Sequence, residues 1–432
     1  MADEFDCIVV GAGIAGSSAA IRLAQGGANV LLVDRANPIG SKNLSGGVLW
    51  GHELDRILPN WWKEGPVERP VTTKQVVFLN QEDSLTLSFK ANEWTEEPYN
   101  AFTVLRAKFD AWLAGEAEKA GAMVVPGSAV DKMSFDKSGQ VNGIIQAGET
   151  IPAKSVIVAD GCNSRVLINS GLKKRENPDE VVLGVKEVIK LPEEVIAQRF
   201  NVGPAQGVAG EYILGYLKNG VMAGGFLYTN RDTISLGVVI NLKSIWMKNV
   251  YTREMVEDFR MHPHIQKLLE GGEVVEYGAH LIPEWGVHDM PPLYGNGFCT
   301  VGDAAGFVFS NGLIIEGMNY AAASGIEAAD TILGAKKKGD YSAKILKEYE
   351  QRCADRFILK DMKRFKNMGK VVWNERMFSK YSPMVTDIFK SMLTEKGDPK
   401  TPSRVHVRKQ VKKHRVKPWE LLIDGIQGAR YL

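Results

Sequence analysis

A glycine-rich turn between a buried strand and a helix constrains the fold of this 432-residue chain more than any other feature. Residues 5–10 (FDCIVV) form a short apolar run, and residues 11–16 (GAGIAG) follow it as a GxGxxG motif. The next residues are small or favour helices, and a second apolar run ends at Asp34, 23 residues after Gly11. Such a motif is informative when it follows a strand and opens a helix. The chain is therefore expected to contain a βαβ unit at this point.

The glycines and the acidic residue of this unit have distinct expected roles in binding a dinucleotide. Gly11 permits the tight turn, Gly13 lets the backbone approach a pyrophosphate, and Gly16 lets the helix pack closely on the strand. The N-terminus of the helix offers free N–H groups and partial positive charge to the phosphates. The carboxylate of Asp34 is expected to accept a hydrogen bond from a ribose hydroxyl, and it disfavours the 2′-phosphate of NADP. The cofactor-binding residues expected here are Gly11, Gly13, Ala15, Gly16, Asp34 and Arg35.

Two later motifs, each directly after a strand-like run, specify the dinucleotide as FAD. Asp160-Gly161 follows the run SVIVA, and Gly302-Asp303 follows GFCT. A βαβ unit alone binds ADP, whereas Asp303 can bind the hydroxyls of a ribityl chain. A helix beginning near Gly312 is expected to direct its positive end at the flavin edge that gains negative charge on reduction.

These three motifs resemble those of the FAD-dependent superfamily of aromatic hydroxylases, geranylgeranyl reductases and electron-transfer-flavoprotein:quinone oxidoreductases, to about residue 370. Within that resemblance, Arg106 in TVLRAKFDAWL matches a family arginine at the start of a helix, which implies a position beside the FAD phosphates. A surface helix arginine is the alternative.

The closer resemblance is to the quinone oxidoreductases, and within them to the FixC or EtfC subunits of electron-bifurcating Fix/Etf complexes. The segments that carry it are 42–49, 223–230, 262–286 and 302–325. This resemblance implies that Ser45, Gly46 and Gly47 border the flavin. It also implies that Asn311 and Gly312 lie beside the flavin, although residues 313–318 depart from the family pattern.

The resemblance further implies a quinone site at the glycine pair Gly224-Gly225 in AGGFLYT. The match is offset, so that Ala223 takes the place of one family glycine. A missing side chain would let a planar ring approach the backbone. A strand bulge packed on the FAD domain is the alternative.

The predicted fold class is α/β plus α+β: a Rossmann-like FAD domain, an inserted antiparallel-sheet substrate domain and a helical, basic C-terminal region. The FAD domain is expected to be discontinuous, at 1–75, 101–170 and 293–345. The sheet-rich quinone domain is expected at 76–100 and 171–292, with Asn219-Gly220 as a hairpin turn. Residues 346–432 are expected to meet a partner or a membrane.

The four cysteines, Cys7, Cys162, Cys299 and Cys353, are far apart, and no CxxC motif occurs. A zinc ribbon or a local iron–sulfur motif is therefore excluded, and a reducing compartment is expected. No metal ligand is predicted, and His262 and His264 are expected in a solvated turn. The resemblance implies that a separate ferredoxin-like subunit supplies a [4Fe–4S] cluster, that electron-transfer flavoprotein α and β subunits deliver the electrons, and that menaquinone or ubiquinone receives them.

The charge is nearly balanced overall, with 53 basic and 51 acidic residues, which argues against nucleic-acid binding. Residues 401–432, however, hold eight Lys and Arg against two acidic residues. This stretch could be a solvated tail, or it could bind an acidic ferredoxin-like partner or anionic lipid. Trp61-Trp62 and the segment 377–393 could enter one membrane leaflet or pack on the protein. No apolar run is long enough to span a bilayer, so a cytoplasmic protein peripheral to the inner face of the cell membrane is expected.

Two other functions share this pattern. A geranylgeranyl-type reductase of prenyl lipids has the same fold, but the segment AGGFLYTN lacks the tryptophan-containing pattern expected there. An FAD-bound scaffold without turnover of its own is the third hypothesis.

Overall fold

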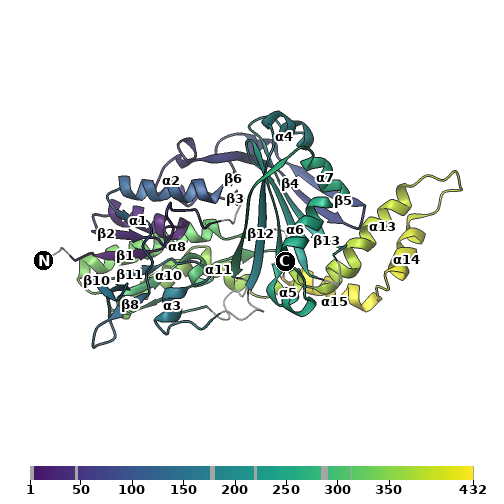
Figure 1. Cartoon of the computed structure of the whole chain (residues 1–432). Coiled ribbons are helices and arrows are strands. Elements are labelled where there is room, and N and C mark those ends of the chain that lie inside the picture. Colours follow the sequence, from purple (N-terminus) through teal and green to yellow (C-terminus); the bar gives the residue numbers. More distant parts are fainter. Residues whose placement is uncertain are drawn as a thin grey trace.

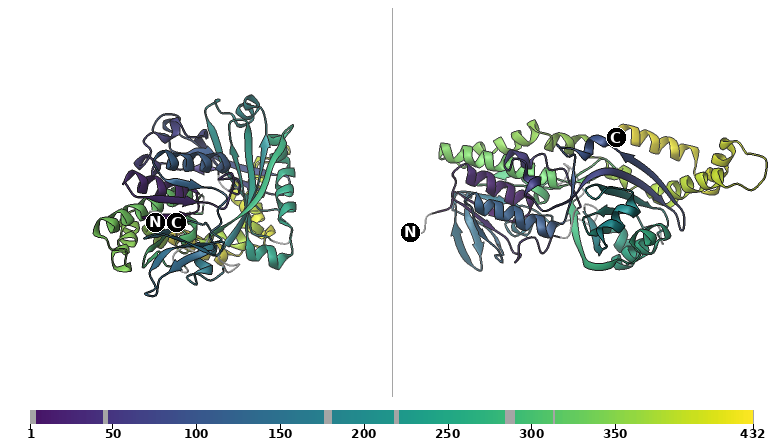
Figure 2. Two further views of the ribbon diagram at one scale, coloured as in Figure 1. Left: turned by 60° about the vertical axis from the view of Figure 1, so that its left-hand side comes forward. Right: turned by 90° about the horizontal axis from the view of Figure 1, so that it is seen from above.

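The computed structural model describes residues 4–43, 47–175, 181–217, 221–283, 290–312 and 314–431. The molecule is elongated, with a six-stranded sheet and its helices at one end and a larger sheet in the middle (Figure 1). A pair of helices projects from the other end, which the view from above shows most clearly (Figure 2).

The six-stranded sheet contains the glycine-rich turn. Its spatial order is β17 (Tyr294–Gly295), β18 (Phe298–Thr300), β11 (Val156–Val158), β1 (Cys7–Val10), β2 (Val30–Val33) and β7 (Met123–Val125). All neighbours are parallel except β17 and β18. Strands β1, β2 and β11 are buried along their whole length, as expected for a parallel sheet covered on both faces.

Helices and a small sheet cover the two faces of this sheet. One face packs on α1 (Ile14–Gln25), α2 (Arg106–Lys119) and α8 (Met318–Lys338). The other packs on the antiparallel sheet of β8 (Lys132–Phe135), β9 (Val141–Gln146) and β10 (Glu149–Pro152), and on α3 (Arg165–Asn169). Helix α8 approaches α1 so closely that a side chain at Gly325 would overlap the carbonyl of Ala15.

The nine-stranded sheet forms the middle of the molecule. Its order is β16 (Glu273–Pro283), β12 (Val181–Lys190), β15 (Thr233–Asn241), β14 (Ala223–Thr229), β13 (Gly207–Leu214), β4 (Val67–Leu79), β6 (Phe102–Val104) and β3 (Val48–Leu49), with β5 (Ser84–Lys90) paired to β4. Strands β13 and β14 pair as the hairpin expected from sequence, although its turn lies outside the described residues. Strands β4 and β13 pair in parallel. The sheet thus includes β3, β6 and the first part of β4, from ranges expected in the FAD domain.

Four helices that connect its strands pack on one face of this sheet. They are α4 (Glu193–Phe200), α5 (Leu242–Lys248), α6 (Thr252–Met261) and α7 (Pro263–Leu269), and in Figure 1 most of them lie on the side away from the six-stranded sheet. The opposite face of the nine-stranded sheet is therefore directed toward the six-stranded sheet.

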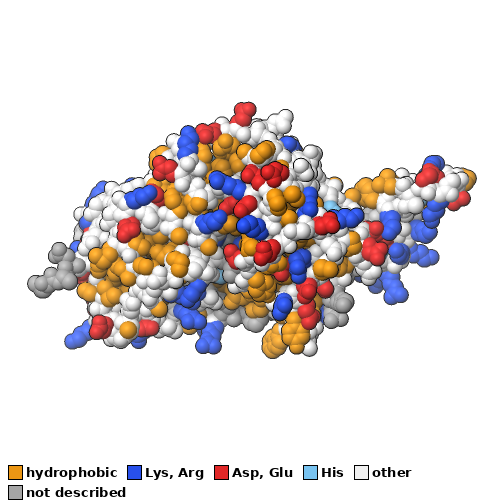
Figure 3. All heavy atoms as spheres, turned by 45° about the horizontal axis from the view of Figure 1, so that its top comes forward, with side chains coloured by type: hydrophobic (Ala, Val, Ile, Leu, Met, Phe, Trp, Pro, Cys, Tyr) orange, Lys and Arg blue, Asp and Glu red, His pale blue; other side chains and the backbone are white. Residues whose placement is uncertain are grey.

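The C-terminal region is helical, as expected from the sequence. Its first part is divided into the short helices α9 (Ala343–Leu346), α10 (Glu348–Asp355), α11 (Ile358–Arg364) and α12 (Gly369–Val372). The segment Met377–Tyr381 and α13 (Ser382–Leu393) follow, and the basic stretch forms α14 (Ser403–Lys413) and α15 (Pro418–Tyr431). This stretch is therefore not a solvated tail, since α14 packs on α13 and α15 packs on α12. Figure 3 shows Lys and Arg gathered along one edge of the projecting arm.

No helix in the described part of the chain has the length and apolar character that crossing a bilayer requires. The aromatic pair considered for membrane insertion packs inward instead. Trp61 is 3% exposed, donates from Nε1 to the carbonyl of Gly51 at 3.0 Å, and makes edge contacts with Phe102 and Phe109. Trp62 packs against the same core, so this pair is not a membrane anchor.

Candidate functional site

A cavity of about 720 Å³ lies between the six-stranded sheet and the face of the nine-stranded sheet opposite α4 to α7. Its lining comes from segments far apart in the chain: the glycine-rich turn, the loops after β2, β11 and β18, the start of α2, and strands β4, β13, β14 and β16. The residues expected around FAD that line it are Gly11, Gly13, Ala15, Asp34, Arg35, Gly47, Arg106, Asp160, Gly161, Asp303 and Gly312. Ser45 and Gly46 lie outside the described residues.

The three motif glycines occupy different environments. A side chain at Gly11 would overlap the carbonyl of Ala159, and Gly11 has a φ of +104°. A side chain at Gly16 would overlap the carbonyl of Gly11, so helix and strand touch there. A Cβ at Gly13 would meet only Arg106 Nη2, at 3.7 Å. Gly11 and Gly16 are thus required by packing, whereas Gly13 leaves space where a pyrophosphate fits.

Arg106 is held beside that space by the first turn of α2. Its guanidinium donates to both carboxylate oxygens of Asp110, at 2.8 and 2.7 Å, and Asp110 is fully buried. Burial lowers the pKa of the Arg106 guanidinium, but the neighbouring Asp110 carboxylate has the larger combined effect, so the pKa is raised. A fixed cation next to Gly13 suits the FAD phosphates, as the sequence match implied.

Asp34 and Asp160 hold the loops that follow β2 and β11. Asp34 accepts hydrogen bonds from Ala12 N and Ala36 N, both at 2.7 Å, and its carboxylate retains lone pairs for a ribose. Asp160 Oδ2 accepts from Val166 N at 2.9 Å, whereas its buried Oδ1 has no partner among the described residues. Burial raises the pKa of Asp160 to about 6.

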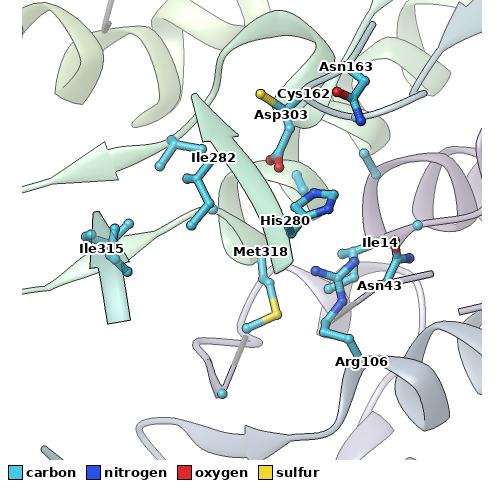
Figure 4. A pocket seen from close by; sticks show the side chains of 18 of the residues that line it. Ile14, Asn43, Arg106, Cys162, Asn163, His280, Ile282, Asp303, Ile315 and Met318 are labelled. Carbon is cyan, nitrogen blue, oxygen red and sulfur yellow. The ribbon is translucent and has the colours of Figure 1, made fainter. Parts of the chain in front are cut away.

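Asp303 lies in the turn Gly302–Ala305 and faces a histidine that the sequence analysis did not single out. Figure 4 shows the ring of His280, from β16, between the Asp303 carboxylate and the Arg106 guanidinium. Burial raises the pKa of Asp303, opposed by His280 and Arg106, and burial lowers the pKa of His280. A carboxylate at this depth suits the ribityl hydroxyls, which can donate to it without adding charge.

The helix after Gly302-Asp303 begins later than expected. Residues Phe309–Ser310 (β19) first pair with Ile315–Glu316 (β20), and α8 begins at Met318 rather than near Gly312. A Cβ at Gly317, which caps this helix, would lie 3.8 Å from Asp303 Oδ1, so the helix N-terminus still points into the site. Gly312 lies in the turn between the two strands with a φ of +88°. Asn311 is not among the lining residues, and its Oδ1 accepts from Ile314 N at 3.0 Å.

The glycine pair expected at the quinone lies in a regular strand. Gly224 and Gly225 pair without a register shift with β13 and β15, so the alternative of a strand bulge is wrong. The two residues face opposite sides of the sheet. A Cβ at Gly225 would press on Phe259 of α6 at 2.8 Å, whereas a Cβ at Gly224 would meet only the carbonyl of Tyr212, at 3.7 Å. Gly224 therefore shares the cavity face with Phe226 and Tyr228.

Three polar residues near this glycine pair were missed by sequence reasoning. Tyr228 donates from Oη to Glu211 Oε1 at 3.0 Å, and Lys74 Nζ lies 3.7 Å from the same oxygen. Glu211 is the only charged residue in the apolar strand 207–214, and that isolated charge was an available signal. The partners could not be read from the sequence, because the pairing of β4 with β13 brings them together.

The remaining candidates have structural roles. His262 is buried rather than solvated: Nε2 lies 2.7 Å from the carbonyl of Asn80, and Nδ1 accepts from His264 N at 3.2 Å. Within the described ranges, no group of three or more His, Cys, Asp or Glu is placed to hold a metal ion. All four cysteines are buried, and within the described part of the chain none of them forms a disulfide.

Comparison with known proteins places this geometry in a family. Residues 6–97 match a family model described as FAD dependent oxidoreductase, and residues 182–282 match one described as ETF-QO, ubiquinone-binding. Residues 370–432 match the ETF-QO/FixC family C-terminal domain, so the likeness continues beyond residue 370. ETF-QO denotes electron-transfer-flavoprotein:quinone oxidoreductase.

Curated relatives match the chain along its whole length. Protein FixC of Escherichia coli K12 is 40% identical over 432 residues, covering 100% of this chain and 99% of FixC. The chain belongs to the FixC/ETF-QO family. Another relative from the same strain, the probable electron transfer flavoprotein-quinone oxidoreductase YdiS, is 40% identical over 430 residues with the same coverage. FixC of Azotobacter vinelandii is 34% identical over 95% of both chains.

Solved structures confirm the FAD-dependent fold of this FixC-family chain. A geranylgeranyl bacteriochlorophyll reductase-like protein from Thermoplasma acidophilum has a TM-score of 0.71 at 20% identity, over 98% of this chain and 99% of that one. The flavin-dependent brominase Bmp2 has a TM-score of 0.63 at 16% identity, over 96% and 100%. The predicted fold class, the FAD cofactor and the assignment as an FAD-dependent oxidoreductase of the quinone oxidoreductase type are thus confirmed.

Proposed function

We propose that this FixC-family protein passes electrons from a partner iron–sulfur protein and electron-transfer flavoprotein, through its FAD, to a membrane quinone within a bifurcating Fix/Etf complex. One observation carries the proposal: a single cavity joins a polar end that suits FAD to an apolar end that suits a quinone. Bound FAD supplies the redox chemistry, because it accepts and releases electrons singly or in pairs.

The apolar end of the cavity has the chemistry of a quinone site. It is lined by Val76 and Phe78 of β4, Ile213 of β13, and Trp373 and Phe378 of the C-terminal region. The bare backbone of Gly224 leaves space for a planar ring against the sheet. These side chains exclude water around the ring, while the polar end holds FAD through the glycine-rich turn and Arg106.

Helix α15 supports a location at a membrane surface. Trp419, Leu422, Ile423 and Ile426 follow the i, i+3, i+4, i+7 spacing of one helix face, and each is between 47% and 63% exposed. This helix packs on α12, whose Val371 and Val372 line the apolar end of the cavity. An apolar helix face beside a basic helix fits the interface of a membrane with anionic lipids. A quinone tail would then enter from that side, at the inner face of the cell membrane.

The electron-donating partners are the second part of this proposal. The described residues provide no cluster site, so a ferredoxin-like subunit is proposed to carry the [4Fe–4S] centre. Electron-transfer flavoprotein α and β subunits would deliver electrons to it. The basic cluster on and after α14, from Arg404 to Lys417, suits an acidic protein of this kind.

The test is to reduce the purified holoprotein, alone and with its partner subunits, and to mix it anaerobically with short-chain menaquinone and ubiquinone analogues. We expect rapid, saturable reoxidation of the flavin. Flavin that stays reduced with every quinone, or saturation of a prenyl diphosphate detected by mass spectrometry, would contradict the proposal. For the membrane, Leu422→Asp should weaken binding to anionic vesicles, whereas Leu87→Asp, a similarly exposed leucine on β5, should not.

A further inference from the structure

A half-buried polar group lies on the cavity face of the nine-stranded sheet, at the apolar end beside Gly224. It consists of Tyr228 on β14, Glu211 on β13 and Lys74 on β4. Tyr228 and Glu211 both line the cavity, whereas Lys74 lies behind them. Burying ionisable side chains in an apolar site is costly and calls for a function.

The three polar groups form one line that begins at the cavity. Tyr228 Oη lies 3.0 Å from Glu211 Oε1, and that oxygen lies 3.7 Å from Lys74 Nζ. The Lys74 side chain is 21% exposed, and its Nζ lies 5.4 Å from the ring centroid of Trp50, with no hydrogen-bond partner among the described residues. The Nζ atom of Lys74 is itself buried, so Lys74 serves as a counter-ion to Glu211, whose side chain is 26% exposed and can take up protons from solvent.

We infer that Tyr228 and Glu211, with Lys74 as the counter-ion of Glu211, form a relay that delivers protons to the substrate in the cavity. This inference rests on the proposed quinone reduction, because a quinone consumes two electrons and two protons on its way to a quinol. Those protons need a donor on the protein, because the apolar side chains exclude water from around the quinone ring.

Each proton transfer leaves atoms and charges balanced. When Glu211 is protonated, its O–H donates to the Tyr228 oxygen, which frees the tyrosine proton for the substrate. The phenolic proton passes to a quinone oxygen, and the carboxyl proton replaces it on Tyr228. The Glu211 carboxylate, which stays paired with the Lys74 ammonium, takes up the next proton from solvent at its exposed side. Two such passes supply both protons, while the two electrons come from reduced FAD.

The surroundings of Glu211 favour a carboxyl that exchanges protons. Burial raises its pKa, while Lys74 and the hydroxyl of Tyr228 act in the opposite direction. The other groups that face this cluster are Tyr212, on the far side of β13, and Glu316 of β20, which acts on Lys74. Opposing influences of this kind suit a group that must both hold and release a proton.

The test compares two electron acceptors in stopped-flow reoxidation of reduced holoprotein: a short-chain quinone, which takes up protons, and ferricenium, which takes none. Tyr228→Phe and Glu211→Gln retain the size of each side chain. We expect both to slow the quinone reaction by about 100-fold, within the range of a positioned proton donor, with little change in the ferricenium reaction. Tyr216→Phe, which removes a hydroxyl outside the cavity, is the matched control.

A second readout does not depend on turnover. In the infrared region of protonated carboxyls, the wild-type protein should show one titrating component more than Glu211→Gln, whereas the components of Asp160 and Asp303 should appear in both proteins. Equal quinone rates in wild type and variants, or equal slowing with both acceptors, would overturn the relay. A wild-type protein that reacts with ferricenium but with no quinone would instead contradict the proposed function.

Discussion

The aromatic ring of Tyr228 occupies the space into which a side chain at Gly47 would project. Gly47 comes just before β3, and Tyr228 lies on the cavity face of β14, so this contact fixes the position of the phenol. Gly47→Ala should overlap the ring and lower the free energy of unfolding by about 1–3 kcal/mol, measured by urea denaturation. Gly115→Ala on α2, where nothing lies within 4 Å, is the control and should raise stability slightly. A Gly47→Ala protein as stable as wild type would contradict this packing.

The motif glycines should separate FAD binding from folding. Gly13→Val extends into the space beside Arg106 and should give a folded but colourless protein, because the pyrophosphate loses its place. Gly16→Val would overlap the backbone of Gly11 and should prevent folding altogether. Flavin absorbance and far-UV circular dichroism distinguish the two results. A yellow Gly13→Val protein with full FAD content would refute the assignment of the phosphate site.

Asp160 should make stability depend on pH. Its pKa of about 6 in the folded protein is above the ordinary 3.8, so its charged form destabilises the fold above pH 6. The free energy of unfolding should therefore rise as the pH falls from about 6 to about 4 and Asp160 becomes protonated in the folded protein. Asp160→Asn should therefore raise stability at pH 8 by about 2 kcal/mol and remove this pH dependence. Urea denaturation at pH 5 and 8 checks this, with Asp398→Asn in an exposed loop as the control.

Helix α15 should detach in acid. Arg376 Nε donates to Asp424 Oδ2 at 2.7 Å, and Tyr381 also donates to this carboxylate. The hydrogen bonds from Arg376 lower the pKa of Asp424 to about 2. The stabilisation of α15 by the ionised carboxylate is therefore present above pH 4 and is lost as the pH falls from about 4 to 2. Asp424→Ala should release α15 at neutral pH and accelerate proteolysis after residue 413. Unchanged cleavage would show that other contacts hold the helix.

The FAD end of the site was readable from the sequence because each element carries its own local signal. These signals lie in short motifs that follow strands: the glycines of residues 11–16, the acids Asp34 and Asp303, and the helix of Arg106. The position of each of these residues depends on its neighbours in the sequence, so each motif is sufficient to predict where its residues lie. The hairpin of β13 and β14 was predictable for the same reason.

The remaining features depend on contacts between distant segments. Lys74 meets Glu211 only because β4 and β13 pair in parallel across more than 130 residues, and His280 meets Asp303 across two sheets. Trp61 looks like a surface residue in its loop, yet it fills the core between Phe102 and Phe109. The start of α8 moved to Met318 because β19 and β20 pair first, and short two-residue strands leave little trace in a sequence.

Gly224 provides the most direct test of quinone reduction in this cavity. Gly224→Val should fold, since the position is open on the cavity side, and it should fill the space proposed for the ring. The measurement is the rate of flavin reoxidation when reduced holoprotein is mixed with increasing concentrations of a short-chain quinone. We predict complete, saturable reoxidation of the wild type and at least a tenfold loss of apparent affinity in Gly224→Val, about 1.4 kcal/mol. Two results would contradict quinone reduction in this cavity. One is wild-type flavin that stays reduced in excess quinone, and the other is a Gly224→Val protein with the same apparent quinone affinity as wild type.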